Sequence, residues 1–217
     1  MVALNCIINQ RCPRPANAHE YRSRSLSCGE EVRLYDRITL WRWLRLEFDP
    51  TVTDLAVNCM MFEGAGCRVP ITFSYLKHGK PWLVIRENGP VDAVESLHEY
   101  CALLNIVVEV LEGSWSSSRH VEMWNLLKIT SYIHKWSNMI TEKRLAVVAR
   151  DVLGCGEISI QELCSGDLES NAETLAVAFE LVRRGRLCIP DLYNFKITQN
   201  SLVTVNKPVL ISGADNG

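Results

Sequence analysis

The chain has 217 residues, of which 47% are hydrophobic and 22% charged, and its formal net charge is −2. This length allows one large domain or two small ones, and the charge does not indicate bulk nucleic-acid binding. No apolar run approaches the ~18 residues of a membrane span, and the N-terminus MVALNCIINQRCPRP is too interrupted for a secretory signal. We therefore expect a cytoplasmic protein without a membrane partner.

The nine cysteines are odd in number, scattered, and form no C-x-x-C pair. This pattern excludes a zinc knuckle and favours buried apolar thiols in a reducing compartment. The basic charge is confined to residues 1–47, which carry eight Arg, no Lys and five acids. Such a strip of arginines can contact phosphates, although ion pairing on a solvated face explains it equally well.

In the N-terminal part, residues 1–28 are predicted to form an irregular arm, with a short strand allowed over Val2 to Ile8. The apolar spacing of residues 30–48, near 3.6, predicts a helix that stops at Asp49-Pro50. We expect Trp41 and Trp82 in the core, and Trp43 and Trp115 at the surface.

The middle of the chain reads as a meander followed by a crossover. The predicted strands are 52–62, 67–76, 82–86 and 106–111, and the predicted helices are 91–104 and 121–139, the second interrupted near Ser131. A tight HGKP turn joins the second and third strands. The fold class predicted from this order is α/β, with a mixed sheet flanked by helices.

The C-terminal part predicts three helices and a hairpin. The helices are 142–153, a short one capped by Ser159 with Glu162 in a capping box, and one that starts at an Asn171 cap and ends at Arg184. Segments 186–192 and 195–205 form the hairpin of a winged-helix arrangement. The predicted domains are an arm (1–28), an α/β domain (29–139), a winged-helix domain (140–207) and a disordered tail (208–217).

Several short stretches follow one another in a characteristic order: Ser23-Arg24, LEFDPTV at 46–52, Pro70 with KPWLV at 80–84, EYCALLNI at 99–106, WNLLKI at 124–129 with Tyr132, and RRGRL at 183–187. In this order they resemble the TnsA family, the endonuclease subunits of heteromeric transposases. The resemblance spans about residues 22–205 and implies a restriction-endonuclease-like PD-(D/E)XK fold.

The catalytic residues of such nucleases are absent at the corresponding positions. Two or three carboxylates and a Lys are needed to hold Mg²⁺ and to activate water. In this chain the acid of the first helix is replaced by Ile38 or Thr39, and the Asp of the first hairpin strand by Ile71 or Thr72. In the second hairpin strand, Val84 or Ile85 replaces the Glu, and Arg86 or Glu87 replaces the Lys. An apolar group cannot bind Mg²⁺, and Arg is no base near neutral pH. The resemblance thus predicts a pseudo-nuclease without catalytic residues and without a cofactor.

The resemblance further implies a prokaryotic mobile-element protein that acts on DNA with a transposase, with another TnsA-like subunit, or with an AAA+ regulator. The candidate DNA-binding residues are all arginines: Arg22, Arg24, Arg33, Arg37, Arg42, Arg183, Arg184 and Arg186. Two alternatives stay open. One is an adaptor or inhibitor that does not bind DNA, which the apolar and acidic helix NAETLAVAFELV favours. The other is an active Mg²⁺ nuclease that uses the relocated acids Asp36, Glu63 and Glu87.

Overall fold

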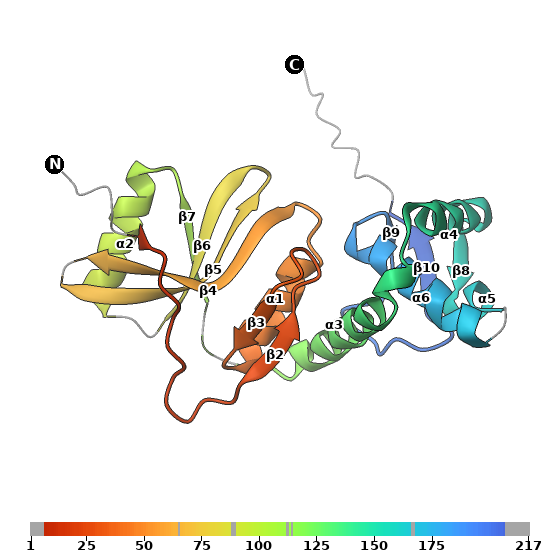
Figure 1. The fold of residues 1–217 in the computed structure, drawn as a ribbon, viewed down its shortest axis with the longest axis horizontal. Coiled ribbons are helices and arrows are strands. Elements are labelled where there is room, and N and C mark those ends of the chain that lie inside the picture. The colour runs from red at the N-terminus through yellow and green to blue at the C-terminus, as the bar shows by residue number, and fades with distance from the viewer. Residues whose placement is uncertain are drawn as a thin grey trace, which may run out of the picture. The chain divides into compact units, whose positions relative to one another are not determined.

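A computed structural model describes residues 7–64, 66–87, 90–111, 113, 115–165 and 168–206 (Figure 1). Its contacts divide the chain into two compact units, Met1–Leu127 and Lys128–Gly217. The division falls inside one helix, α3 (Ser118–Lys135), whereas the sequence placed a domain boundary near residue 139. The expected tail 208–217 and most of the expected strand at 2–8 lie outside the described residues.

A five-stranded mixed sheet forms the centre of the first unit. Its order is β1-β4-β5-β6-β7, and the strands are β1 (Ile7–Ile8), β4 (Val52–Gly64), β5 (Cys67–Lys77), β6 (Lys80–Arg86) and β7 (Val107–Leu111). All neighbours are antiparallel except β6 and β7, which are parallel and joined through helix α2 (Val91–Leu103). The predicted α/β class with a mixed sheet and flanking helices is confirmed.

The hairpin between β5 and β6 turns at His78 and Gly79. Both residues have positive φ, 49° and 75°, which is the backbone of a type I′ turn. Glycine adopts this conformation without strain, and histidine is one of the residue types enriched there. The predicted two strands and tight turn are therefore confirmed, with both strands slightly longer than expected.

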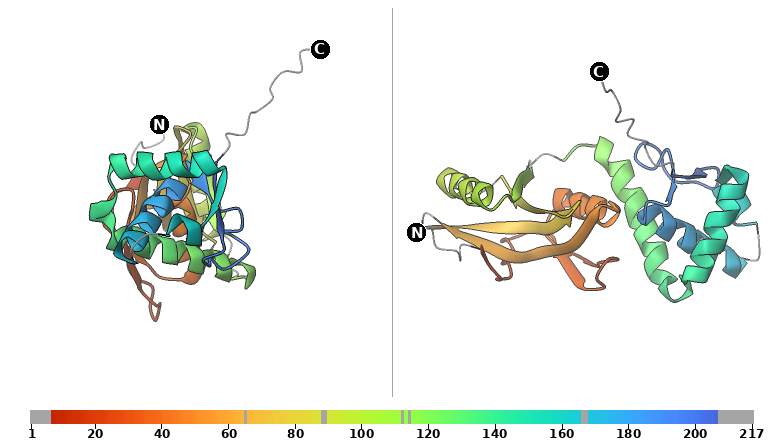
Figure 2. Two further views of the ribbon diagram at one scale, coloured as in Figure 1. Left: turned by 90° about the vertical axis from the view of Figure 1, so that its right-hand side faces the viewer. Right: turned by 90° about the horizontal axis from the view of Figure 1, so that it is seen from above.

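Helix α2 covers one face of this sheet (Figure 2). Its buried residues Ala93, Leu97 and Cys101 pack against side chains of β4, β5 and β6. These strand residues are Phe62, Val69, Ile71, Leu83 and Ile85. Because side chains alternate along a strand, Val84 and Arg86 point to the other face. Burial in the α2 core raises the pKa of the Cys101 thiol to about 11. The expectation of buried cysteines holds for Cys12 and Cys101 but is wrong for Cys28 and Cys155, which are exposed.

The predicted helix over residues 30–48 is wrong in its first part. Residues Tyr21–Arg24 and Glu31–Leu34 form an antiparallel ribbon, β2 and β3, and helix α1 (Arg37–Glu47) begins only after Asp36. Val32 and Leu34 fit the residue spacing of both a strand and a helix, so the spacing of apolar residues alone could not distinguish the two. Asp36 decides the boundary, because its carboxylate accepts the Thr39 N–H at 2.8 Å and caps the helix.

Two further expectations for the first unit need correction. Trp43, expected at the surface, is fully buried at 0% exposure, whereas Trp41 lies in the core as expected. Helix α3 runs without a break at Ser131, and a 3-10 turn, η1 (Ser137–Met139), follows it.

The second unit surrounds a small three-stranded sheet of order β8-β10-β9. Its elements after η1 are α4 (Glu142–Cys155), β8 (Glu157–Ser159), α5 (Ile160–Leu163), α6 (Leu168–Arg183), β9 (Leu187–Cys188) and β10 (Leu202–Val205). The capping box of Ser159 and Glu162 is present as predicted. Helix α6 begins at Leu168, so Asn171 is not its cap. The paired strands β9 and β10 are much shorter than the predicted hairpin arms.

Helix α6 is enclosed by its neighbours. Every residue from Ala176 to Val182 is buried, including Glu180. Tyr132 of α3 packs edge-on against Phe179, with ring centroids 5.6 Å apart and planes at 84°. The middle of α6 therefore has no solvent-exposed face. Within the described part of the chain, no helix is long and apolar enough to cross a bilayer.

Candidate functional site

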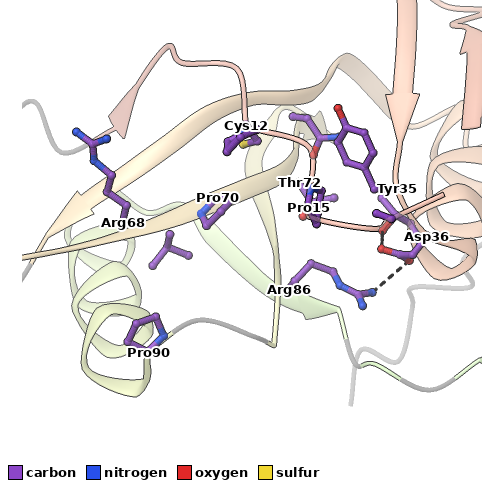
Figure 3. Close-up of a pocket in the computed structure, with 14 residues that line it drawn as sticks. Cys12, Pro15, Tyr35, Asp36, Arg68, Pro70, Thr72, Arg86 and Pro90 are labelled. Atoms are coloured by element: carbon purple, nitrogen blue, oxygen red, sulfur yellow. Dashed lines mark hydrogen bonds and ion pairs between the residues drawn. The ribbon is translucent and has the colours of Figure 1, made fainter. Parts of the chain in front are cut away.

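A cavity of about 420 Å³ lies in the first unit at the N-terminus of α1 (Figure 3). Three parts of the chain form its wall: the arm that leads to β2, the β3–α1 junction, and the strands β4, β5 and β6. The lining residues are Cys12, Pro13, Pro15, Ala18, Tyr35, Asp36, Thr39, Asn58, Arg68, Val69, Pro70, Thr72, Arg86 and Pro90.

Three positions that the resemblance aligns with catalytic residues line this cavity: Thr39, Thr72 and Arg86. The alternatives Ile71 and Ile85 instead lie in the α2 core at 1% and 0% exposure. Ile71 pairs with Ile85 across the hairpin, and the next residue in each strand, Thr72 or Arg86, faces the other side of the sheet. The structure thus places Thr72 and Arg86, rather than Ile71 and Ile85, on the cavity side of the hairpin.

Asp36 provides the carboxylate of this cavity. One oxygen, Oδ1, accepts the Thr39 N–H at 2.8 Å, and the other, Oδ2, accepts the Thr39 hydroxyl at 2.7 Å. Arg86 Nη1 lies 3.5 Å from Oδ1, which makes a long ion pair. Helix capping engages both oxygens of Asp36, and no second carboxylate is found among the described residues that line the cavity. The cavity instead combines the Asp36 carboxylate with the Arg86 guanidinium beside the positive end of a helix. Arg68 also lines it, but its guanidinium pairs with Glu63.

The relocated-acid alternative finds little support in the described geometry. Of Asp36, Glu63 and Glu87, only Asp36 lines the cavity. Glu63 forms an ion pair with Arg68 at 2.6 Å, and Glu87 is exposed at the end of β6. Among the residues that the structure describes, no three His, Cys, Asp or Glu side chains are disposed to hold a metal ion.

The arm before β2 contributes cavity residues that the sequence did not indicate. The Cys12 N–H donates to the Asn58 carbonyl at 2.9 Å, and the Cys12 thiol donates to the Met60 carbonyl at 3.2 Å. Asn58 has a φ of 51° and its side-chain amide donates to the Arg33 carbonyl at 2.8 Å. No motif marks these long-range contacts, although a positive φ at an Asn is a recurrent feature of irregular strands.

The candidate DNA-binding arginines do not form one strip. Arg22, Arg24 and Arg33 lie on the solvent side of the β2–β3 ribbon, and Arg22 is directly opposite Arg33. Glu20 binds Arg22 at 2.8 Å, and Glu31 binds Arg33 at 2.6 Å. The hydrogen bond from Arg22 is the largest cause of the lowered pKa of Glu20. These ion pairs offset part of the positive charge of the ribbon.

Arg37 and Arg42 occupy different surroundings. Arg37 is exposed in the first turn of α1. Arg42 is half-buried, where its guanidinium pairs with Glu109 of β7 and lies 3.4 Å from the Tyr75 hydroxyl. Burial, opposed by the Arg42 charge, raises the pKa of Tyr75 to about 12. Arg42 therefore ties α1 to the sheet, and the structure does not place it with the ribbon arginines.

The three arginines near the end of α6 are also largely engaged. Arg183 and Arg184 both bind the buried Glu180, each with a nitrogen 2.7 Å from a carboxylate oxygen. Arg184 reaches Glu142 at 2.8 Å as well. Arg186 is exposed. This arrangement favours a structural role for Arg183 and Arg184 over phosphate contact.

Comparison of the chain with models of known protein families gives no match. Comparison with curated protein sequences gives none either.

Proposed function

We propose that this protein is a TnsA-like pseudo-nuclease that acts in DNA transposition or in DNA processing by a mobile element. It binds DNA, a transposase partner, or both, without cleaving the DNA. The observation that carries the proposal is the cavity at the N-terminus of α1. Thr39, Thr72 and Arg86 line it, where a nuclease of this type has acids and a Lys, and an Asp36–Arg86 pair occupies it.

The order of the elements supports the same proposal. A helix, an antiparallel meander and a parallel strand reached through a crossover helix are the expected core of a PD-(D/E)XK fold. In the second unit the order is α4, β8, α5, α6, β9, β10, with β10 between β8 and β9. This topology resembles a winged helix, whose second and third helices correspond to α5 and α6.

DNA contact by the first unit is better supported than DNA contact by the second. The helix that corresponds to a recognition helix, α6, is buried from Ala176 to Val182 and cannot enter a groove. Arg22 and Arg24 of the ribbon and Arg37 of α1 are exposed on the first unit. Exposed arginines of this kind contact phosphates rather than base edges. We therefore expect DNA binding that depends weakly on sequence and strongly on salt concentration.

Purified protein incubated with supercoiled plasmid and Mg²⁺ or Mn²⁺ is expected to leave the plasmid uncut. The physical reason is that Thr39 and Thr72 offer no carboxylate, which leaves Asp36 as the one acid among the described residues that line the cavity. Agarose electrophoresis measures nicking and linearisation. Cleavage of the plasmid would support the relocated-acid nuclease if EDTA abolishes it and if either Asp36→Ala or Glu87→Ala also abolishes it. That result would overturn the pseudo-nuclease proposal.

The triple variant Arg22→Ala, Arg24→Ala, Arg37→Ala is expected to lower DNA affinity by at least tenfold at low salt. Each lost phosphate contact reduces the counterions released on binding, so the slope of log affinity against log salt also falls. Fluorescence anisotropy with a labelled duplex, repeated at several salt concentrations, measures both quantities.

A charge-matched control separates local contact from net charge. The variant Lys143→Ala, Arg150→Ala, Lys196→Ala removes three exposed cations from the second unit. We expect it to bind DNA nearly as the unchanged protein does. Equal losses in the two variants, or no loss in the ribbon variant, would remove the ribbon as the DNA contact.

An adaptor that binds only protein is the second candidate. Two observations favour it: carboxylates pair with Arg22 and Arg33 of the ribbon, and the middle of α6 is buried. The resemblance names a transposase, a second TnsA-like subunit or an AAA+ regulator as its partner. Affinity purification with and without nuclease treatment discriminates the candidates. A complex that survives nuclease, together with no measurable DNA binding, selects the adaptor.

A further inference from the structure

A second cavity of about 420 Å³ lies wholly within the second unit. The C-terminal part of α3, helices α5 and α6, and the connection between β9 and β10 form its wall (Figure 1). The corresponding lining residues run from Lys128 to Gln199, so the cavity involves no residue of the first unit. The proposed function gives this cavity no role.

The inner wall of this cavity is apolar and firmly packed. Ile160, Phe179 and Ile197 line it and are 5%, 1% and 7% exposed. The edge-on contact of Tyr132 with Phe179 fixes one side. An apolar cavity of about 150 Å³ accommodates benzene, so this volume is sufficient for an apolar group of two rings.

The rim of the cavity carries polar groups, among them one cation. The Lys128 ammonium donates to the Ile197 carbonyl at 3.2 Å, which uses one of its three N–H groups. Within the described part of the chain it has no carboxylate partner. The side chains of Gln161 and Asn171 belong to the same wall. An apolar floor with a few convergent polar groups is the usual constitution of a small-molecule site.

We infer that this cavity binds a small organic anion with an aromatic or branched aliphatic body. The carboxylate or sulfonate of such a ligand pairs with the Lys128 ammonium, and its body packs on Ile160, Phe179 and Ile197. The Lys128 ammonium then gains an anionic partner from the ligand. Because this position is partly dehydrated, the charge-assisted hydrogen bond is stronger there than in water.

The cavity binds its ligand without covalent chemistry. Cys164 is the nucleophilic side chain in its wall, and its thiol donates to the Asn171 carbonyl at 3.5 Å. Burial raises the pKa of this thiol above its ordinary value, so it stays protonated and unreactive near neutral pH.

The test compares the binding of two fluorescent probes to the full chain. 8-Anilinonaphthalene-1-sulfonate carries a sulfonate, and N-phenyl-1-naphthylamine has the same ring system without a charge. We expect the anionic probe to bind the unchanged protein more tightly than the neutral probe. Lys128→Met is expected to weaken binding of the anionic probe about tenfold while leaving the neutral one unchanged, because only the charge-assisted hydrogen bond is lost.

Two further variants locate the probes. Ala172→Phe adds a ring to the cavity wall and is expected to weaken both probes. Lys143→Met removes an exposed lysine of α4 and should alter neither. Circular dichroism and thermal unfolding confirm that each variant is folded. Equal affinity for the two probes, or unchanged anionic-probe binding in Lys128→Met, overturns the inference, as does binding of both probes that Ala172→Phe does not weaken.

Discussion

Replacement of Glu180 by Ala is expected to destabilise the second unit by about 3 kcal/mol, because breaking a buried ion pair leaves the remaining buried charge without a partner. The Glu180 side chain is 5% exposed and binds Arg183 through two hydrogen bonds of 2.7 Å and Arg184 through a third. Arg183 itself is only 17% exposed. Hydrogen exchange of α6 peptides, followed by mass spectrometry, measures the change in this unit separately.

The same carboxylate gives the second unit a defined pH dependence. Burial raises the pKa of Glu180, but the hydrogen bonds from Arg183 and Arg184 outweigh burial, so its pKa lies below the ordinary 4.5. A lowered folded-state pKa contributes stability that is present above pH 4.5 and is lost as the pH falls through the folded-state value. Glu180→Gln should remove this acid-side loss of stability.

Glu142→Ala is the matched control for Glu180→Ala. Glu142 binds the same Arg184 at 2.8 Å, but its side chain is 78% exposed. Solvent screening reduces such a contact to less than about 1 kcal/mol. A loss in Glu142→Ala as large as that in Glu180→Ala would contradict the role assigned to burial.

Trp43→Ala is expected to destabilise the first unit by about 3 to 5 kcal/mol, the usual range for deletion of a buried large aromatic side chain. Trp43 is 0% exposed in α1. It is one of the largest fully buried side chains of the described residues, so its removal opens a cavity that its neighbours cannot fill. Urea unfolding, with hydrogen exchange of α1 peptides as a second readout, measures the loss.

Trp43→Phe provides a matched variant of much smaller effect. The indole Nε1 has no hydrogen-bond partner among the described residues, and an unpaired buried N–H costs free energy in the folded state. Phenylalanine removes that group and keeps most of the apolar volume. A loss comparable to that of Trp43→Ala would indicate that the indole N–H has a partner.

Local patterns were sufficient for much of the fold. The His78-Gly79 turn, the capping box at Ser159 and the short strand before α3 each follow from residue types at fixed spacing. The β3–α1 boundary could not be predicted in this way, because Val32 and Leu34 fit two periods and the Asp36 cap decides between them. The burial of Trp43 depends on packing partners distant in sequence.

The candidate site was predictable in outline but not in register. The sequence left Ile71 or Thr72, and Arg86 or Glu87, as alternatives. Ile71 pairs with Ile85 in the α2 core, so Thr72 and Arg86 face the cavity, and no residue pattern marks which pair lies in that core. The arginines show a similar limit, since only long-range geometry pairs Arg42 with Glu109.

The most direct test of the pseudo-nuclease proposal measures binding and cleavage on the same DNA. A labelled duplex is titrated with protein in Mg²⁺ and again in EDTA, and the recovered DNA is examined by denaturing electrophoresis. We predict fully intact strands in both conditions and binding that weakens as salt rises, with a lower affinity in Mg²⁺ because this cation competes for the phosphates. Strand cleavage in Mg²⁺ would contradict the proposal, and no binding in either condition would contradict DNA contact by the first unit and favour the adaptor.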